Sequence, residues 1–254
     1  MNDPSPRFWP IFFELYESLP RQGPGNRDCA ARALALCRYL PPAAAVLDLG
    51  CGGGGQTLHL AELTSGSIVA LDSHAPSIER LRATVARRRL TERIQPILGD
   101  MANPGLPLAS FDLIWSEGAL YNIGIDNALR LCNGLLRDGG YVAFTDAVWR
   151  RDNAPAKIKA SFEDDYPTMG RVPDILKAIA RNGFSLIDHF TLPDEAWWDE
   201  FYTPMEIRIE ELRGSYKDDD EALAVLDRLA QEPEQHRRYS DYYAYEFFVA
   251  RLMR

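Results

Sequence analysis

A glycine-rich segment at residues 50–55 carries the strongest chemical signal in the sequence. Five of its six residues are glycine, and Cys51 is the sixth. The segment follows a short apolar run, residues 43–50, and opens a stretch with helical spacing, residues 55–64. Glycines lack a Cβ atom and so let a ligand approach the backbone, while the start of the helix offers unpaired N–H groups. This arrangement predicts a loop that holds a nucleotide.

Two ligand classes fit the glycine spacing. Gly50, Gly52 and Gly55 match G-x-G-x-x-G, the pattern of dinucleotide-binding loops. Gly50, Gly52 and Gly54 match the G-x-G-x-G that follows the first strand in methyl-donor enzymes. Both ligands need the same close approach of the backbone, so the glycines alone do not separate the two hypotheses.

Acidic residues at the ends of three strand-like runs do separate them. Asp48, Asp72 and Asp100 lie at these ends, and open parallel sheets bind ligands beyond the carboxyl ends of their strands. Asp48 is expected to point toward the ligand, where it would disfavour a pyrophosphate but suit an ammonium group. Asp72 could accept hydrogen bonds from a ribose diol, and Asp100 from an adenine amine. A neutral-to-cationic adenosyl ligand such as S-adenosylmethionine fits this set better than a dianionic dinucleotide.

Alternating strand-like and helix-like segments predict the elements that position this loop. Strand-like runs lie at residues 43–50, 67–72, 93–100, 111–119 and 139–149. Helical spacing recurs between them, for example in residues 75–90 and 126–137. Such alternation predicts a doubly wound α/β fold, in which helices cover both faces of a parallel sheet.

The other segments are expected to add to this core within a single domain, residues 1–254. Residues 1–40 are predicted to form an N-terminal helical lid, and residues 41–193 a cofactor-binding core. Residues 194–238 are predicted to form two polar helices, inserted before a final strand within residues 239–254. The insertion would lie over one end of the sheet.

Composition and charge restrict the class of protein. Of 254 residues, 46% are apolar and 26% charged, as in ordinary globular proteins. The net charge of −9 makes nucleic acid a poor partner, and the one basic segment, residues 87–93, is interpreted as the solvated end of a helix. The cysteines lack metal-ligand spacing, which predicts reduced thiols, a cytoplasmic location and no metal site. No apolar run approaches the ~18 residues of a membrane span, so no membrane insertion is expected.

Five ordered motifs resemble the class I S-adenosylmethionine-dependent methyltransferases. They are VLDLGCGGGG, IVALD, ILGDM, FDLIWSEGALYNIG and LLRDGGYVAFTD, which together span roughly residues 40–150. With RQGPG at residues 21–25, they are similar to a bacterial small-molecule subgroup, itself loosely similar to the ubiquinone/menaquinone methyltransferases. The resemblance implies a Rossmann-like, seven-stranded, mostly parallel sheet whose last strand is antiparallel, and residues 241–252 would supply that strand.

The resemblance also implies which residues bind the cofactor. Asp48 and the glycine loop would line its methionine end, where Arg21 is a further candidate. Asp72 would take its ribose hydroxyls, and Asp100 with Met101 would hold its adenine. The complete predicted set is Gln22, Asp48, Gly50, Cys51, Gly52, Gly54, Gln56, Thr57, Asp72, Ser73, Gly99, Asp100, Met101, Ser116 and Glu117.

Candidate catalytic groups follow the fourth and fifth strands, where the donor methyl group should point. They are Glu117, Tyr121 and Asp146. Methyl transfer from a sulfonium is an in-line displacement, so positioning supplies much of the catalysis and a base is needed only if the acceptor loses a proton. Each candidate has a structural alternative, namely capping of backbone groups or support of a loop. The expected substrate pocket consists of Tyr121 and the aromatic residues Trp9, Trp149, Trp197 and Trp198, each of which could instead pack in the core.

These observations favour methyl transfer from S-adenosylmethionine to a small-molecule acceptor, with S-adenosylhomocysteine as product. A nicotinamide-dependent oxidoreductase, favoured by Gly55, is one alternative. A methyltransferase acting on a macromolecule and a non-catalytic S-adenosylmethionine-binding protein are two others. The sequence leaves open whether O, N, C or S is methylated, whether a general base is needed and whether the chain forms a homodimer.

Overall fold

Seven strands form one sheet in the computed structural model, which describes residues 5–163 and 165–253. The order across the sheet is β3-β2-β1-β4-β5-β7-β6. The bounds are β1 (Val46–Leu49), β2 (Ile68–Asp72), β3 (Ile94–Leu98), β4 (Phe111–Glu117), β5 (Leu136–Trp149), β6 (Phe184–Thr191) and β7 (Tyr243–Leu252). Strands β1 to β5 pair in parallel, whereas β7 runs antiparallel to both β5 and β6. The predicted fold class, including the antiparallel last strand, is confirmed.

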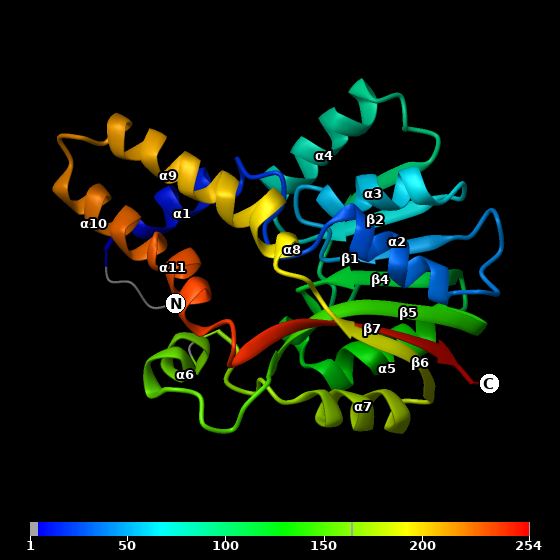
Figure 1. Cartoon of the computed structure of the whole chain (residues 1–254). Helices are drawn as coiled ribbons and strands as arrows, with labels where there is room; N and C mark the ends of the chain where they lie inside the picture. Colours follow the sequence, from blue (N-terminus) through cyan, green and yellow to red (C-terminus); the bar gives the residue numbers. More distant parts are fainter. Residues whose placement is uncertain (1–4, 164, 254) are drawn as a thin grey trace.

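Helices cover both faces of the sheet, as Figure 1 shows. One face carries α2 (Arg27–Leu36), α3 (Gly55–Leu63) and α4 (Ala75–Arg87), and the other carries α5 (Ile125–Leu135) and α7 (Val172–Arg181). Successive side chains of a strand point to opposite faces. Val46 therefore packs in the core beneath α2, α3 and α4, and Leu47 packs in the core beneath α5 and α7. Strands buried on both sides explain why the runs in the sequence are continuously apolar.

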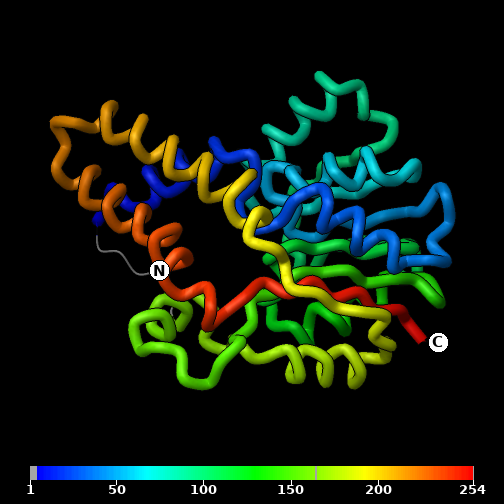
Figure 2. Tube along the Cα trace, in the orientation of Figure 1, coloured from blue at the N-terminus to red at the C-terminus, as the bar shows by residue number. Residues whose placement is uncertain are grey.

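A separate group of helices lies beyond one end of the sheet, at the left of Figures 1 and 2. We call it the helical cap: α1 (Phe8–Tyr16) together with the helices of residues 195–239. The latter are α8 (Glu195–Trp197), the π-helical turn η2 (Trp198–Tyr202), α9 (Thr203–Ser215), α10 (Asp220–Leu229) and α11 (Gln231–Tyr239). Its apolar core includes Ala147 near the end of β5 and Tyr243 at the start of β7. The cap therefore meets the sheet where β5 ends.

The prediction of two polar helices in residues 194–238 is wrong in number and character. Three helices of nine or more residues form, and each buries part of its surface. Met205, Ile209 and Leu212 recur at helical spacing along α9 and pack against α1. A largely polar composition hid this stripe, because only one face of each helix is apolar. Within the described residues no helix combines the length and apolarity needed to cross a bilayer.

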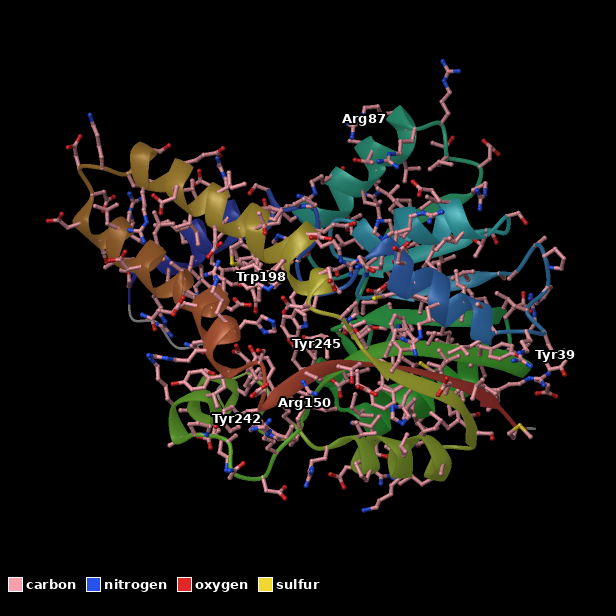
Figure 3. All side chains as sticks on the ribbon, in the orientation of Figure 1. Tyr39, Arg87, Arg150, Trp198, Tyr242 and Tyr245 are labelled. Atoms are coloured by element: carbon pink, nitrogen blue, oxygen red, sulfur yellow. The ribbon has the colours of Figure 1, made fainter. Side chains whose placement is uncertain are left out.

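The basic segment at residues 87–93 lies away from the cap. Figure 3 shows Arg87 at the outer end of α4. Arg93 differs from its neighbours, since its guanidinium donates to the carbonyl oxygens of Ala61, Thr64 and Gly66. This part of the basic segment fastens the end of α3 to the loop before β2.

Candidate active site

The glycine loop is tightly packed between β1 and α3. The Gly50 and Cys51 N–H groups both donate to the Leu71 carbonyl oxygen, at 2.8 and 3.0 Å. Gly52 has a φ of +51°, and a Cβ atom on it would lie 2.4 Å from Oε1 of Gln22. A side chain at this position would meet both a strained backbone and a clash. The positive φ therefore favours glycine at this position, and the surface of the loop here is bare backbone.

The Asp48 side chain lies in the packed layer beneath the glycine loop, whereas the sequence predicted that it points toward the ligand. Its side chain is fully buried and accepts hydrogen bonds from Thr57 Oγ1 at 2.6 Å and Gln56 Nε2 at 3.3 Å. Burial raises the pKa of its carboxyl group to about 7, although the bond from Thr57 opposes the shift. Because Asp48 lies inside β1 rather than after it, its side chain belongs to the packed layer between β1 and α3. It fastens the first turn of α3 beneath the glycine loop.

A cavity of about 870 Å³ lies between the glycine loop and the helical cap. This volume lies within the range of about 300–1,000 Å³ usual for small-ligand sites. Members of the predicted cofactor set that line it are Gln22, Gly50, Cys51, Gly52, Gln56, Asp72, Ser73, Asp100, Met101 and Glu117. The members that lie behind its wall are Asp48, Gly54, Thr57, Gly99 and Ser116. Ser116, for example, is buried and donates from its hydroxyl to the Leu49 carbonyl oxygen at 2.7 Å.

Asp72 connects the glycine loop to the start of α4. Its two carboxylate oxygens accept from the N–H groups of Gly52 and His74, each at 2.8 Å. The His74 ring stacks on Phe13 of α1, with 4.6 Å between ring centroids, and its Nε2 lies 2.7 Å from Oε1 of Glu17. These contacts hold α1 over this end of the cavity. Neither His74 nor Phe13 belongs to the predicted cofactor set. His74 follows Asp72 by two residues, which allowed either a contact with the adenosyl group or a solvated loop, and the aromatic N-terminal helix was the available signal for Phe13.

A buried ion pair joins the turn at residues 21–25 to the end of β4. Arg21 Nη2 donates to Glu117 Oε2 at 2.7 Å, and the two side chains are only 4% and 2% exposed. The other carboxylate oxygen of Glu117 accepts from the Trp115 indole N–H at 2.7 Å. A Cβ atom on Gly25 would lie 2.4 Å from Glu117 Oε2, which explains the glycine in this turn. The pair closes one wall of the cavity.

One nitrogen of the Arg21 guanidinium lacks a partner. Nη1 is buried and makes no hydrogen bond within the part of the chain that the structure describes. A buried, unsatisfied charged donor is costly unless a ligand completes it. At the wall of this cavity it fits an anionic group such as the carboxylate of S-adenosylmethionine. The donor set and the bare glycine loop thus both fit this cofactor.

Aromatic side chains line the half of the cavity nearest the cap. Of the predicted pocket residues, Tyr121, in the short 3-10 helix η1 (Leu120–Ile123), and Trp197 do so. The sequence also led us to expect Trp9, Trp149 and Trp198 in the pocket, but none of the three borders this cavity. Trp9 lies one helical turn before Phe13 and is 50% exposed, Trp149 packs edge-on against Phe162, and Trp198 lies under the guanidinium of Arg237.

Several lining aromatics were not predicted from the sequence. They are Phe12, Phe13, Tyr16, Phe162, Tyr166, Phe201, Tyr243 and Tyr245. Tyr202, which the aromatic segment at residues 195–204 suggested as part of a lid, also borders the cavity. Figure 3 shows Tyr245 in the middle of the molecule, between the sheet and the cap. The spacing of Phe12 and Tyr16, i and i+4, was a usable signal for one shared helix face. Nothing local indicated Tyr166, which follows α6 (Ala156–Glu163).

Asp146 reaches the cavity only through another side chain. Its carboxyl group is 1% exposed and accepts from the Tyr166 hydroxyl at 2.8 Å. Burial raises the pKa of Asp146 to about 7. The Tyr166 ring lies 4.8 Å from that of Tyr121 and, like it, borders the cavity. Throughout residues 5–163 and 165–253, no group of three or more His, Cys, Asp or Glu side chains is arranged to hold a metal ion.

The sheet order, the antiparallel β7 and the glycine loop after β1 define a Rossmann-like fold with a nucleotide-sized site. Residues 46–140 match the family model described as a methyltransferase domain. This match confirms the resemblance of the central part of the chain to the class I S-adenosylmethionine-dependent methyltransferases that the motifs indicated.

Curated relatives match the chain over part of their length. The sterol 24-C-methyltransferase erg6 of Aspergillus fumigatus is 26% identical over 180 residues, which is 68% of this chain and 46% of the relative. The sarcosine/dimethylglycine N-methyltransferase of Halorhodospira halochloris is 31% identical over 136 residues, or 52% of this chain and 48% of the relative. The chain thus spans about half the length of the curated relatives it matches.

Solved structures show the same fold over nearly the whole chain. A SAM-dependent methyltransferase from Geobacter sulfurreducens, in complex with S-adenosyl-L-homocysteine, has a TM-score of 0.80 at 19% identity and covers 97% of this chain and 98% of its own. A putative sarcosine dimethylglycine methyltransferase from Galdieria sulphuraria has a TM-score of 0.74 at 20% identity and covers 89% and 84%. At these identities the likeness is one of fold.

Proposed function

We propose that the chain is an enzyme that transfers the methyl group of S-adenosylmethionine to a small-molecule acceptor. The observation that supports this most is the cavity whose wall joins the glycine loop to the aromatic rings of the helical cap. The cofactor supplies a methyl group on a positively charged sulfur, so the residues of the chain have to bind and align two molecules. In the transfer, an electron pair of the acceptor forms the new bond to carbon, and the carbon–sulfur pair stays on sulfur in S-adenosylhomocysteine.

The residues near the glycine loop are proposed to hold the cofactor. Arg21 would bind its carboxylate through the unpartnered Nη1. Asp72 would accept from its ribose hydroxyls, because each carboxylate oxygen keeps a lone pair beyond the backbone bond it already accepts. Asp100 and Met101 would border its adenine. Glu117 is proposed to position Arg21, because its Oε2 accepts from Arg21 Nη2 at 2.7 Å and its side chain is almost completely buried.

The domain layout supports a covered reaction site. We propose that residues 1–40 and 194–238 act as lids on a core of residues 41–193, completed by the last strand within residues 239–254. Such lids exclude water and hold the acceptor against the methyl group. Tyr121 and Tyr166 are proposed to contact the acceptor, and Asp146 to orient the Tyr166 hydroxyl.

Small molecules are the proposed acceptors. The relatives named for sterol and for sarcosine/dimethylglycine methylation support this class, and the net charge of −9 disfavours nucleic acid. The four cysteines are free and buried, which fits a cytoplasmic location.

Ligand binding tests the proposal first. Titration with S-adenosylhomocysteine, S-adenosylmethionine, NAD and NADP, followed by thermal unfolding and calorimetry, should show binding of the adenosyl ligands alone. A ligand at 100 times its dissociation constant stabilises the folded state by about 2.7 kcal/mol, and Asp72→Ala should remove this shift. Binding of a nicotinamide cofactor instead would overturn the proposal. Binding without formation of S-adenosylhomocysteine from any acceptor would favour the non-catalytic alternative.

A further inference from the structure

The half of the cavity nearest the cap has walls of aromatic rings held in fixed positions by one another. Tyr16 stacks on Phe12 with 4.3 Å between ring centroids, and Phe201 stacks on Tyr202 at 4.6 Å. Trp197 meets Tyr245 edge-on at 5.2 Å. All of these residues border the cavity. Ring faces attract cations through their quadrupole, so such a wall suits a positively charged group as well as an apolar one.

Carboxylates in the same wall distinguish these two possibilities. Glu232 of α11 borders the cavity and accepts from the hydroxyl groups of Tyr16, at 2.5 Å, and Tyr202, at 3.2 Å. Burial raises the pKa of Glu232, while its two tyrosine bonds oppose the shift. Asp165 contributes a second carboxylate, and Arg228 a guanidinium that lies 5.3 Å from the ring centroid of Phe8. An entirely apolar ligand would keep water from the Glu232 carboxylate without supplying an opposite charge of its own, which is unfavourable.

We propose that this half of the cavity binds an amine, so that the chain is an N-methyltransferase for small amines. The inference rests on the proposed function. Glu232 and Asp165 would supply opposite charge, and the rings of Tyr16, Trp197 and Phe201 would border the rest of the substituted nitrogen.

The chemistry of amine methylation fits such a wall. An amine that binds as its ammonium ion first loses a proton to water. The lone pair of the neutral amine then forms the N–C bond while the C–S bond breaks, and the electron pair of the C–S bond stays on sulfur. The positive charge therefore moves from sulfur to nitrogen and is not lost. A site of ring faces and carboxylates accommodates the charge at both positions. If the product nitrogen carries a hydrogen, that proton leaves to water.

A pair of isosteric probes tests the inference directly. Choline and 3,3-dimethyl-1-butanol have nearly the same shape, but only choline is charged. Calorimetry on the full chain saturated with S-adenosylhomocysteine, which lacks the sulfonium charge, should show choline binding at least tenfold tighter. Equal affinities, or no binding of choline, would overturn the proposal. Failure of S-adenosylhomocysteine itself to bind would instead refute the proposed function.

Matched variants test whether the Glu232 carboxylate causes the preference for the charged probe. Glu232→Gln should weaken choline binding at least tenfold and leave the affinities of 3,3-dimethyl-1-butanol and S-adenosylhomocysteine unchanged. Glu234→Gln is the control, because Glu234 lies on the same helix with its side chain 67% exposed. Asp165→Asn provides a second charge-removing change if Glu232→Gln does not fold. An equal loss in the control variant, or turnover of hydroxyl or carbon acceptors with amines inactive, would contradict the assignment.

Discussion

Arg21 provides the sharpest test of how the cofactor would be held. Its Nη2 donates to Glu117, while its buried Nη1 has no hydrogen-bond partner within the described residues and is the nitrogen proposed to bind the carboxylate. Hydrogen bonds to charged groups contribute about 1.5–3 kcal/mol, so loss of the guanidinium should weaken S-adenosylhomocysteine binding about 10- to 150-fold. 5′-Methylthioadenosine shares the adenine, ribose and sulfur but lacks the carboxylate, and its affinity should not change.

A variant of Arg21 alone is expected to be unstable, because the Arg21–Glu117 ion pair is buried. Removal of one partner leaves an uncompensated charge and costs about 3–5 kcal/mol of stability. The double variant Arg21→Met/Glu117→Gln removes both charges and should remain folded. Calorimetric titration of this variant and of the unmodified chain with both ligands gives the comparison. An equal loss of affinity for the two ligands would show that Arg21 supports the loop and does not bind the carboxylate, which would refute the reasoning.

Three further predictions concern the loop, its support and the cavity wall. Burial raises the pKa of Asp48 from 3.8 to about 7, so between these values the folded state holds a proton that the unfolded chain releases, and stability falls as pH rises. The Asp48→Asn variant should lack this contribution, which lowers the free energy of unfolding by at most about 1.4 kcal/mol per pH unit. Urea unfolding of both chains across this pH range measures the difference, and an unchanged slope would contradict the assignment. Gly52→Ala should cost about 1–2 kcal/mol in thermal unfolding for its left-handed backbone alone and should weaken adenosyl-ligand binding, whereas binding equal to that of the unmodified chain would show that the loop tolerates a side chain. Trp197→Ala should lower methyl transfer and Trp9→Ala should not, because only Trp197 borders the cavity; equal effects in an activity assay would argue against this cavity as the acceptor site.

The sequence predicted the sheet and the glycine loop well for a physical reason. Both depend on local patterns: apolar runs of strand length, helical spacing, and glycines where φ is positive, as at Gly52. The carboxyl ends of parallel strands lie at one edge of the sheet, so the topology also brings Asp72 and Asp100 to the same cavity.

Side-chain direction at the end of a strand was less predictable. Asp48 is one residue too early to reach the cavity, and its position in the sequence does not distinguish a ligand contact from a buried anchor of α3. Asp146 has the same ambiguity, since its partner Tyr166 follows a separate helix. In both cases the deciding contact comes from another element.

What the sequence determined by itself was the class of fold and the place of the nucleotide loop, because periodicity and backbone freedom are properties of a few consecutive residues. Only the tertiary structure decided the composition of the site. Arg21 and Glu117 are 96 positions apart, and Tyr16 and Glu232 are 216 apart. The helical cap brings such pairs together by burying apolar faces that have no partner within their own segment. The direction of each tryptophan and the charged groups at the cavity wall follow from that packing.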